Sequence, residues 1–165
     1  MPRILKKLEL NGFKSFASRT VLEFSDGITA VVGPNGSGKS NIVDAIRWIL
    51  GEREVKNLRG AKSEDLIFAG TINRPRASKT EVVLYLDNAG KIFSLDFADV
   101  SVSRSLDRGG SSAYTLNGDE VRLKDLLEMK TFILIGSLLG YIWLLTSVIK
   151  VIARSIKAFY QGLKS

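Results

Sequence analysis

The stretch from residue 33 to residue 40 constrains the fold of this chain more than any other feature of its sequence. It reads GPNGSGKS and satisfies the pattern G-x-x-x-x-G-K-[ST]. It follows the short apolar run ITAVVG (residues 28–33) and precedes the helical pattern SNIVDAIRWIL (residues 40–50). A buried strand, a glycine-rich loop and a helix in this order form a phosphate-binding loop. We therefore predict an α/β fold of the P-loop NTPase type.

The chemistry of such a loop assigns a role to each residue type. Glycines let the backbone wrap so that its N–H groups point at phosphate oxygens, and the following helix presents the positive end of its dipole to the same anion. We expect Lys39 to reach the β- and γ-phosphates and the Ser40 hydroxyl to bind Mg²⁺. The binding residues predicted from the motif are Gly33, Pro34, Asn35, Gly36, Ser37, Gly38, Lys39 and Ser40.

Composition excludes several other chemistries. The 165 residues include no cysteine and no histidine, which removes disulfides, thiolate metal sites and the usual zinc ligands. The first ten residues hold no apolar run typical of a secretory signal. Residues 129–165 contain five lysines and arginines and no acid, so they carry five of the seven net positive charges. The basic character therefore belongs mostly to this C-terminal part.

Nucleotide hydrolysis also requires a carboxylate on Mg²⁺ and a group that orients water. The best match to a Walker B strand is VVLYLDN, but Asn88 follows Asp87 where a glutamate is needed. An Asx turn at the end of a strand explains Asp87 better. Asp119 and Glu120 follow Asn117-Gly118, and we assign them to a hairpin. We predict no catalytic residue in this chain.

The rest of the sequence alternates short strand patterns with turns. We expect the helix after the loop to bury Ile42, Ile46 and Ile49 and to stop at Gly51. A second helix is expected to start in RLKDLLEM (residues 122–129). Strands are expected at residues 4–10, 20–24, 28–33, 65–70, 80–88 and 99–106, with a hairpin over residues 114–123 whose tip is Asn117-Gly118.

Six stretches of the chain resemble the N-terminal head segment of bacterial SMC chromosome partition proteins. They are LELNGFKSFASRT, GITAVVGPNGSGKSNIVDAIRWILGE, NLRGAKSEDLIFAG, EVVLYLDN, VSVSR and YTLNGDEVRLKDL, in matching order and spacing over residues 1–127. The resemblance implies an ABC-type ATPase head with a mixed sheet. In that family the N-terminal half of the head carries the Walker A loop. The C-terminal half, beyond a coiled coil and hinge, carries the signature loop and Walker B.

The resemblance also implies site residues and partners. Residues 34–41, which include Asn41, would contact the phosphates of ATP, with Mg²⁺. Lys14, Ser15 and Phe16 would lie near the nucleotide, and Arg59 matches the arginine of the family's R-loop. From the residues alone, Arg59 and Lys62 are ordinary solvated cations, and the resemblance changes that interpretation for Arg59 only. Arg47 stays open between solvent and DNA. The implied partners are a second SMC head, kleisin subunits and DNA, in the cytoplasm at the nucleoid.

The match ends after residue 128, so we divide the chain into an ATPase head segment (1–128) and a divergent tail (129–165). Residues 132–149 carry no charge, a length at the lower end for a membrane-spanning helix. Three interpretations stay open: a membrane or interfacial helix, a buried helix of a shortened domain, and a tail translated through a frameshift or insertion junction. The third fits the abrupt change in composition best. If residues 132–149 crossed a membrane, the cations after residue 149 would keep the C-terminal end in the cytoplasm by the positive-inside rule. The head would then lie on the opposite side, without ATP, which argues against the membrane helix.

We therefore expect an ATP-binding, truncated SMC head that takes part in chromosome condensation and partitioning. We do not expect it to hydrolyse ATP alone, because Walker B, the signature loop and a Gln-Gly loop in register are missing. Gln161-Gly162 is out of register. The alternatives are a non-enzymatic, membrane-associated protein and the head segment of a related recombination or repair ATPase.

Overall fold

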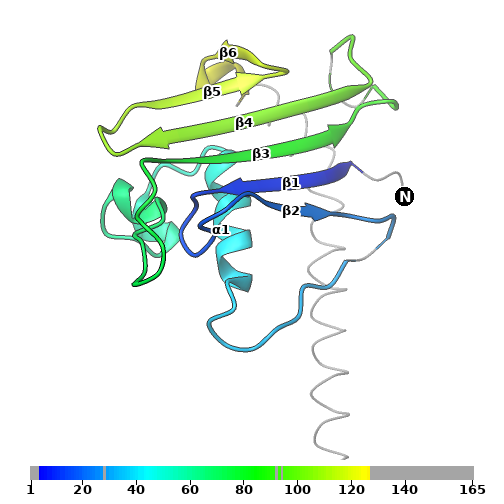
Figure 1. Cartoon of the computed structure of the whole chain (residues 1–165). Helices are drawn as coiled ribbons and strands as arrows, with labels where there is room; N and C mark the ends of the chain where they lie inside the picture. Colours follow the sequence, from blue (N-terminus) through cyan, green and yellow to red (C-terminus); the bar gives the residue numbers. More distant parts are fainter. Residues whose placement is uncertain (1–3, 28, 92, 94, 127–165) are drawn as a thin grey trace, which may run out of the picture.

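A six-stranded antiparallel sheet and one helix organise the molecule (Figure 1). The structure is a computed structural model, which describes residues 4–27, 29–91, 93 and 95–126. The strand order is β2-β1-β3-β4-β5-β6, and every neighbouring pair is antiparallel. The strands are β1 (Leu5–Asn11), β2 (Thr20–Glu23), β3 (Lys79–Asp87), β4 (Asp99–Asp107), β5 (Ser112–Leu116) and β6 (Asp119–Val121). The helices are α1 (Lys39–Ile49) and the 3₁₀ turns η1 (Val55–Leu58) and η2 (Ser63–Leu66).

One face of the sheet forms the core. The register places Leu8 of β1 opposite Leu84 of β3, and Leu84 opposite Val102 of β4. Successive side chains of a strand point to opposite faces, so these three share a face. All three are buried in one cluster with Trp48 and Ile49 of α1. The helix therefore covers the apolar face.

The ends of α1 follow from its sequence. Ile42 and Ile49 are buried and Ile46 is partly buried, as the spacing predicts. After the helix the backbone of Gly51 takes φ 97° and its N–H donates to the Trp48 carbonyl at 3.0 Å. A left-handed residue here stops the helix, and glycine adopts that conformation without a Cβ clash. The predicted stop is confirmed.

The predictions for four single strands and for the hairpin are confirmed. Strands occupy the predicted positions near residues 4–10, 20–24, 80–88 and 99–106, and the β5–β6 hairpin spans the predicted tip. Asn117 and Gly118 have φ of 50° and 94°. Positive φ at both central residues is the signature of a type I′ turn, which Asn-Gly favours. Residues 123–126 are helical, as expected for RLKDLLEM.

Two strand predictions are wrong. Residues 29–33 form no strand and are exposed, with Val32 88% exposed. In Figure 1 this segment belongs to the long irregular loop between β2 and α1, which runs away from the sheet. Among the described residues no strand lies beside it to pair with its backbone groups. Residues 65–70 are also not a strand, because the Asp65 side chain accepts the N–H groups of Ala61 and Lys62 and stabilises η2 instead.

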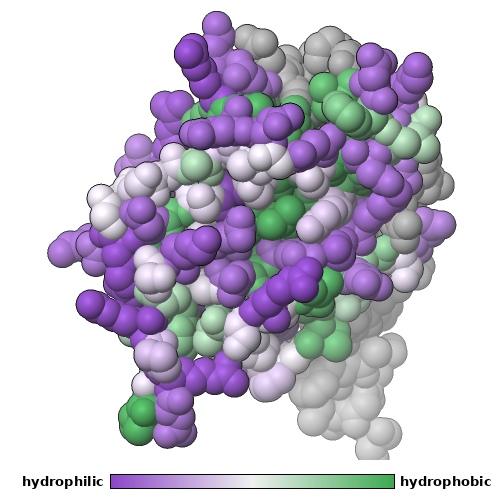
Figure 2. Space-filling model, turned by 45° about the horizontal axis from the view of Figure 1, so that its top comes forward, coloured by the Kyte–Doolittle hydropathy of each residue, from purple (hydrophilic) through white to green (hydrophobic). Residues whose placement is uncertain are grey.

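The described surface is mostly polar. Figure 2 shows hydrophilic side chains over most of the visible face, with hydrophobic ones in single positions or small groups between them. No helix within the described ranges is long and apolar enough to span a bilayer. The uncharged stretch 132–149, the predicted tail helix and the domain boundary at residue 128 lie outside the described residues.

Candidate functional site

The glycine-rich loop adopts a tight turn directly before α1. Gly36 and Gly38 have φ of 82° and 90°, and the Ser37 N–H donates to the Pro34 carbonyl at 3.3 Å. A Cβ built on Gly38 would lie 2.9 Å from the Ser15 Oγ and 3.4 Å from a ring carbon of Phe16. Glycine is therefore required at Gly38 both for its backbone conformation and for the close approach of the early loop.

The helix begins at the loop without a side-chain cap. The N–H groups of Asn41 and Ile42 both donate to the Gly38 carbonyl, at 2.9 and 3.3 Å. The first turn of α1 holds no acid. The N–H groups ahead of the first intrahelical bond have no intrahelical partner and carry the positive end of the helix dipole. The loop and α1 together fit an anion such as phosphate.

Lys39 lies folded over its own loop. Its Nζ donates to the Pro34 carbonyl at 2.6 Å and also to the Gly33 carbonyl. Both contacts are exposed, and a phosphate oxygen could take the place of the two carbonyl oxygens as the acceptor of these charge-assisted hydrogen bonds. Ser40, the residue expected to bind Mg²⁺, is exposed in the first turn of α1. An exposed hydroxyl at this position would be able to hold Mg²⁺ next to a bound phosphate, where the ion would neutralise phosphate charge.

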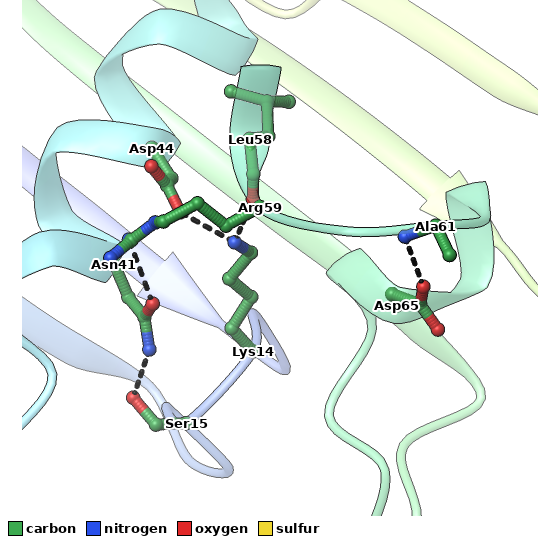
Figure 3. Close-up of polar contacts among 8 residues, drawn as sticks. All are labelled: Lys14, Ser15, Asn41, Asp44, Leu58, Arg59, Ala61 and Asp65. Carbon is green, nitrogen blue, oxygen red and sulfur yellow. Dashed lines mark hydrogen bonds and ion pairs between the residues drawn. The ribbon is translucent and has the colours of Figure 1, made fainter. Parts of the chain in front are cut away.

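Three of the residues singled out by the resemblance meet at the first turns of α1 (Figure 3). The Asn41 Nδ2 donates to the Ser15 Oγ at 2.8 Å, and an Nη of Arg59 donates to the Asn41 Oδ1 at 3.3 Å. Lys14 joins them through a fourth residue, Asp44, which accepts from both Lys14 and Arg59. The structure therefore brings Lys14, Ser15, Asn41 and Arg59 together.

Asp44 is the site residue that sequence reasoning missed. It lies on the buried side of the amphipathic helix α1 and is only 3% exposed, although it carries a carboxylate. That position was the available signal, since a charged residue among core positions is almost never buried without a partner. Lysine or arginine from another segment had to pair with it.

A cavity of about 360 Å³ opens beside this cluster. The carboxylate of Asp65 lines it and accepts the N–H groups of Lys62 and Ala61, at 2.8 and 2.7 Å. These two hydrogen bonds, that from Lys62 first, hold the pKa of Asp65 below its usual value. The carboxylate is thus already stabilised as an anion by the backbone. The residues that line the cavity are Lys14, Asn41, Arg59, Asp65, Ile67 and Ala69.

The other candidates lie away from these contacts or have structural uses. Arg47 and Lys62 are exposed. Asp87, the closest match to a Walker B acid, accepts the N–H of Ala89 at 2.8 Å, which is the predicted Asx turn. Asn88 is 1% exposed and bonds to the backbone of the β3–β4 connection. Within the described residues, no group of three or more acids could hold a metal ion.

The model of a family described as "RecF/RecN/SMC N terminal domain" matches residues 4–137. The chain belongs to this family. Within it, residues 4–126 correspond to the N-terminal segment of an SMC head, which confirms the predicted fold class of an ABC-type P-loop NTPase. The chain is 53% identical over 125 residues to the chromosome partition protein Smc of Mycobacterium leprae. That match covers 76% of this chain and 10% of the relative, so the chain spans about a tenth of its length.

Two solved SMC structures resemble the chain closely. One comes from a study of ATP-driven dimerization and DNA-stimulated activation of SMC ATPases, with a TM-score of 0.75 and 42% identity, and the match covers 79% of each chain. The other is the Pyrococcus furiosus Smc head domain with an extended coiled coil, bound to the C-terminal domain of ScpA. Its TM-score is 0.76 at 42% identity, over 79% of this chain and 33% of that one. The SMC resemblance is thus confirmed at the level of both sequence and fold.

Proposed function

We propose that this chain binds ATP with Mg²⁺ through residues 33–41 and acts as the N-terminal part of an SMC head in chromosome partitioning. The observation that carries the proposal is the loop with left-handed Gly36 and Gly38 that leads directly into α1. A glycine-rich turn at the N-terminus of a helix combines free backbone N–H groups with the positive end of the helix dipole, and this combination supports polyphosphate binding.

The residues of the loop have distinct proposed roles. Lys39 would leave the Pro34 carbonyl and contact the β- and γ-phosphates, and Ser40 would hold Mg²⁺, which neutralises phosphate charge when bound. Lys14, Ser15 and Arg59 would flank the nucleotide, a role supported by the hydrogen bonds that link Ser15 and Arg59 to Asn41. We do not expect hydrolysis by this chain alone. Asp87, the best-matching acid, already accepts the Ala89 N–H and lies 3.5 Å from the Lys6 Nζ.

The exposed segment before the loop supports a partner in the working protein. Val31 and Val32 are 46% and 88% exposed and belong to an apolar run that would suit a buried strand. We propose that the C-terminal half of an SMC head covers it. By analogy with the dimerising SMC ATPases and the ScpA-bound head, a second head, a kleisin subunit and DNA are the further proposed partners, with the nucleoid as the place of action.

The test is ligand-linked stability of the full chain. Mg-ATP at a hundredfold excess over its Kd should add about 2.7 kcal/mol to the free energy of unfolding of the wild type, and should therefore raise its melting temperature. Lys39→Ala should abolish the shift. Lys56→Ala is the matched control, because the side chain of Lys56 is 78% exposed and lies in η1. A wild type that melts at the same temperature with and without Mg-ATP would refute nucleotide binding by this chain.

A further inference from the structure

One buried carboxylate collects two cations from separate segments of the chain. The Asp44 Oδ2 lies 2.5 Å from the Lys14 Nζ, and it accepts Nε and Nη of Arg59 at 3.1 and 2.5 Å (Figure 3). Lys14 belongs to the loop after β1, Arg59 follows η1, and Asp44 is in the second turn of α1. Lys14 also donates to the Leu58 carbonyl, which ties the two loops to each other.

Both cations come from strained backbone. Lys14 and Arg59 have φ of 47° and 57°, the left-handed region that residues with a Cβ rarely adopt. Among the described residues only four other than glycine have positive φ, and two of the four reach this one carboxylate. Such conformations persist where surrounding contacts over-determine them, and they gather at functional sites. The contacts with Asp44 are the ones that both residues share.

The two cations differ in exposure. The Lys14 side chain is 10% exposed, whereas that of Arg59 is 51% exposed beside the cavity of about 360 Å³. Arg59 can therefore contact a ligand while Asp44 holds one side of its guanidinium. Asn41, three residues before Asp44 on the same side of α1, accepts from Arg59 as well. The first two turns of the helix thus fix the direction of Arg59.

We propose that Asp44 is a positioning residue that holds Arg59, with Lys14 behind it, toward the nucleotide. This inference rests on the proposed ATP binding. The proposal predicts a distinctive direction for the change in ATP affinity when the negative charge of Asp44 is removed. If Asp44 acted only through its negative charge, removing that charge would strengthen binding of a polyphosphate. If it positions Arg59, removing the charge releases the arginine and weakens binding.

The first test needs no nucleotide. In the full chain, the Nε–H proton of Arg59 should exchange slowly with water in nuclear magnetic resonance spectra, because it is bonded to a buried carboxylate. Asp44→Asn, which keeps the shape of the side chain, should speed the exchange at least about tenfold. Exchange at the wild-type rate in Asp44→Asn would overturn the clamp whether or not the chain binds ATP.

The second test is Mg-ATP affinity by calorimetry in a double-mutant cycle. Asp44→Asn should weaken binding about tenfold, and the same substitution should have little effect in an Arg59→Ala background. Unchanged or tighter binding, or an equal loss in both backgrounds, would overturn the positioning role. A wild type without affinity would instead refute the proposed function, leaving the exchange test to decide the clamp.

A third variant guards against unfolding, because Asp44→Asn leaves Lys14 without its buried counter-ion. Lys14→Met with Asp44→Asn removes one charge of each sign and keeps similar side-chain volume. This double variant should fold and still show fast Arg59 exchange. Exchange is its readout, because Lys14 is itself proposed to flank the nucleotide, and exchange at the wild-type rate in the folded double variant would refute the proposal.

Discussion

Arg104 of β4 donates a hydrogen bond of 2.7 Å from its guanidinium to the carbonyl oxygen of Trp48 in α1. The same nitrogen donates to the Glu52 carbonyl at 3.0 Å, and the guanidinium carbon lies 4.6 and 4.8 Å from the ring centroids of Trp48 and Tyr114. The last carbonyls of a helix have no intrahelical partner. One arginine of the sheet therefore caps the C-terminal end of the helix whose N-terminal end carries the phosphate-binding loop.

Arg104→Ala should destabilise the chain by about 2–4 kcal/mol, because it removes two charge-assisted hydrogen bonds and two cation–π contacts. The unfolding free energy of Arg104→Lys should lie between those of the wild type and Arg104→Ala, since lysine keeps the charge but not the planar guanidinium group. Chemical denaturation monitored by the fluorescence of Trp48 and the other tryptophan measures the change in unfolding free energy. A loss below about 0.5 kcal/mol, the usual range for surface substitutions, would show that the cap is not stabilising.

Tyr114→Phe is the matched control. The wild-type Tyr114 hydroxyl is buried and has no hydrogen-bond partner among the described residues, and burial raises the pKa of Tyr114. Removing an unsatisfied buried hydroxyl is neutral or stabilising, while the ring that packs on Arg104 remains. We expect an unfolding free energy equal to or above that of the wild type. A clear loss of stability would contradict this expectation, because it would mean that the Tyr114 hydroxyl makes a stabilising hydrogen bond.

Gly38→Ala and Gly36→Ala separate backbone strain from crowding in the loop. Both positions have positive φ, so alanine costs about 1 kcal/mol at each. At Gly36 a Cβ would meet nothing within 4 Å, whereas at Gly38 it would lie 2.9 Å from the Ser15 Oγ. We expect Gly38→Ala to lower the unfolding free energy by clearly more than Gly36→Ala, measured by denaturation. Equal losses would show that the early loop yields without penalty.

Local patterns predicted the elements whose partners lie within this chain. Alternation in β3 and β4 and the Asn117-Gly118 turn are satisfied by neighbouring strands, so those predictions are confirmed. Residues 29–33 have the composition of a buried strand, but no described strand pairs with them. Propensity cannot create a sheet without hydrogen-bonding partners, so the composition of this segment alone could not place it.

The site was predictable where a motif fixes the backbone and not where distant segments meet. The positive φ of Gly36 and Gly38 and the start of α1 follow from the glycine-rich pattern. The pairing of Lys14 and Arg59 on Asp44 spans separations of 30 and 15 residues. No local rule specifies such contacts, because they depend on how the sheet carries the two loops to the helix.

Asp87 and Asn88 test whether the end of β3 has any role with Mg²⁺. Asp87→Asn keeps an acceptor for the Ala89 N–H and therefore preserves the turn. Because we assign Asp87 to this turn and not to Mg²⁺, the substitution should change Mg-ATP affinity by less than about twofold.

Asn88→Ala should instead destabilise the chain by about 2–4 kcal/mol. It removes the amide that bonds to Phe93, Leu95 and Phe97 and leaves their backbone groups unpaired. Calorimetry and denaturation measure the two effects. A large loss of Mg²⁺-dependent affinity in Asp87→Asn would restore it as a metal ligand.

Glu9 gives the chain an acid-sensitive contact on the sheet face opposite α1. The side chain is mostly buried, and Arg19 donates to both of its carboxylate oxygens, at 2.8 and 3.1 Å, with the Lys7 Nζ at 2.8 Å. The hydrogen bonds from Arg19 in the first place, and those from Lys7, lower the pKa of Glu9 below its ordinary value of 4.5, against the opposing effect of burial.

The sign of the pH dependence follows from that direction. The unfolded chain binds a proton at Glu9 more readily than the folded chain, so the contact stabilises the fold above the ordinary pKa and is lost as pH falls through the lower folded-state value. Glu9→Gln should therefore be less stable than the wild type at pH 7, and the two should converge in acid. Arg19→Gln should reproduce this pattern, because it removes the main cause of the shift. Denaturation between pH 3 and pH 7 measures it, and a gap between wild type and Glu9→Gln that stays constant across this range would contradict the assignment.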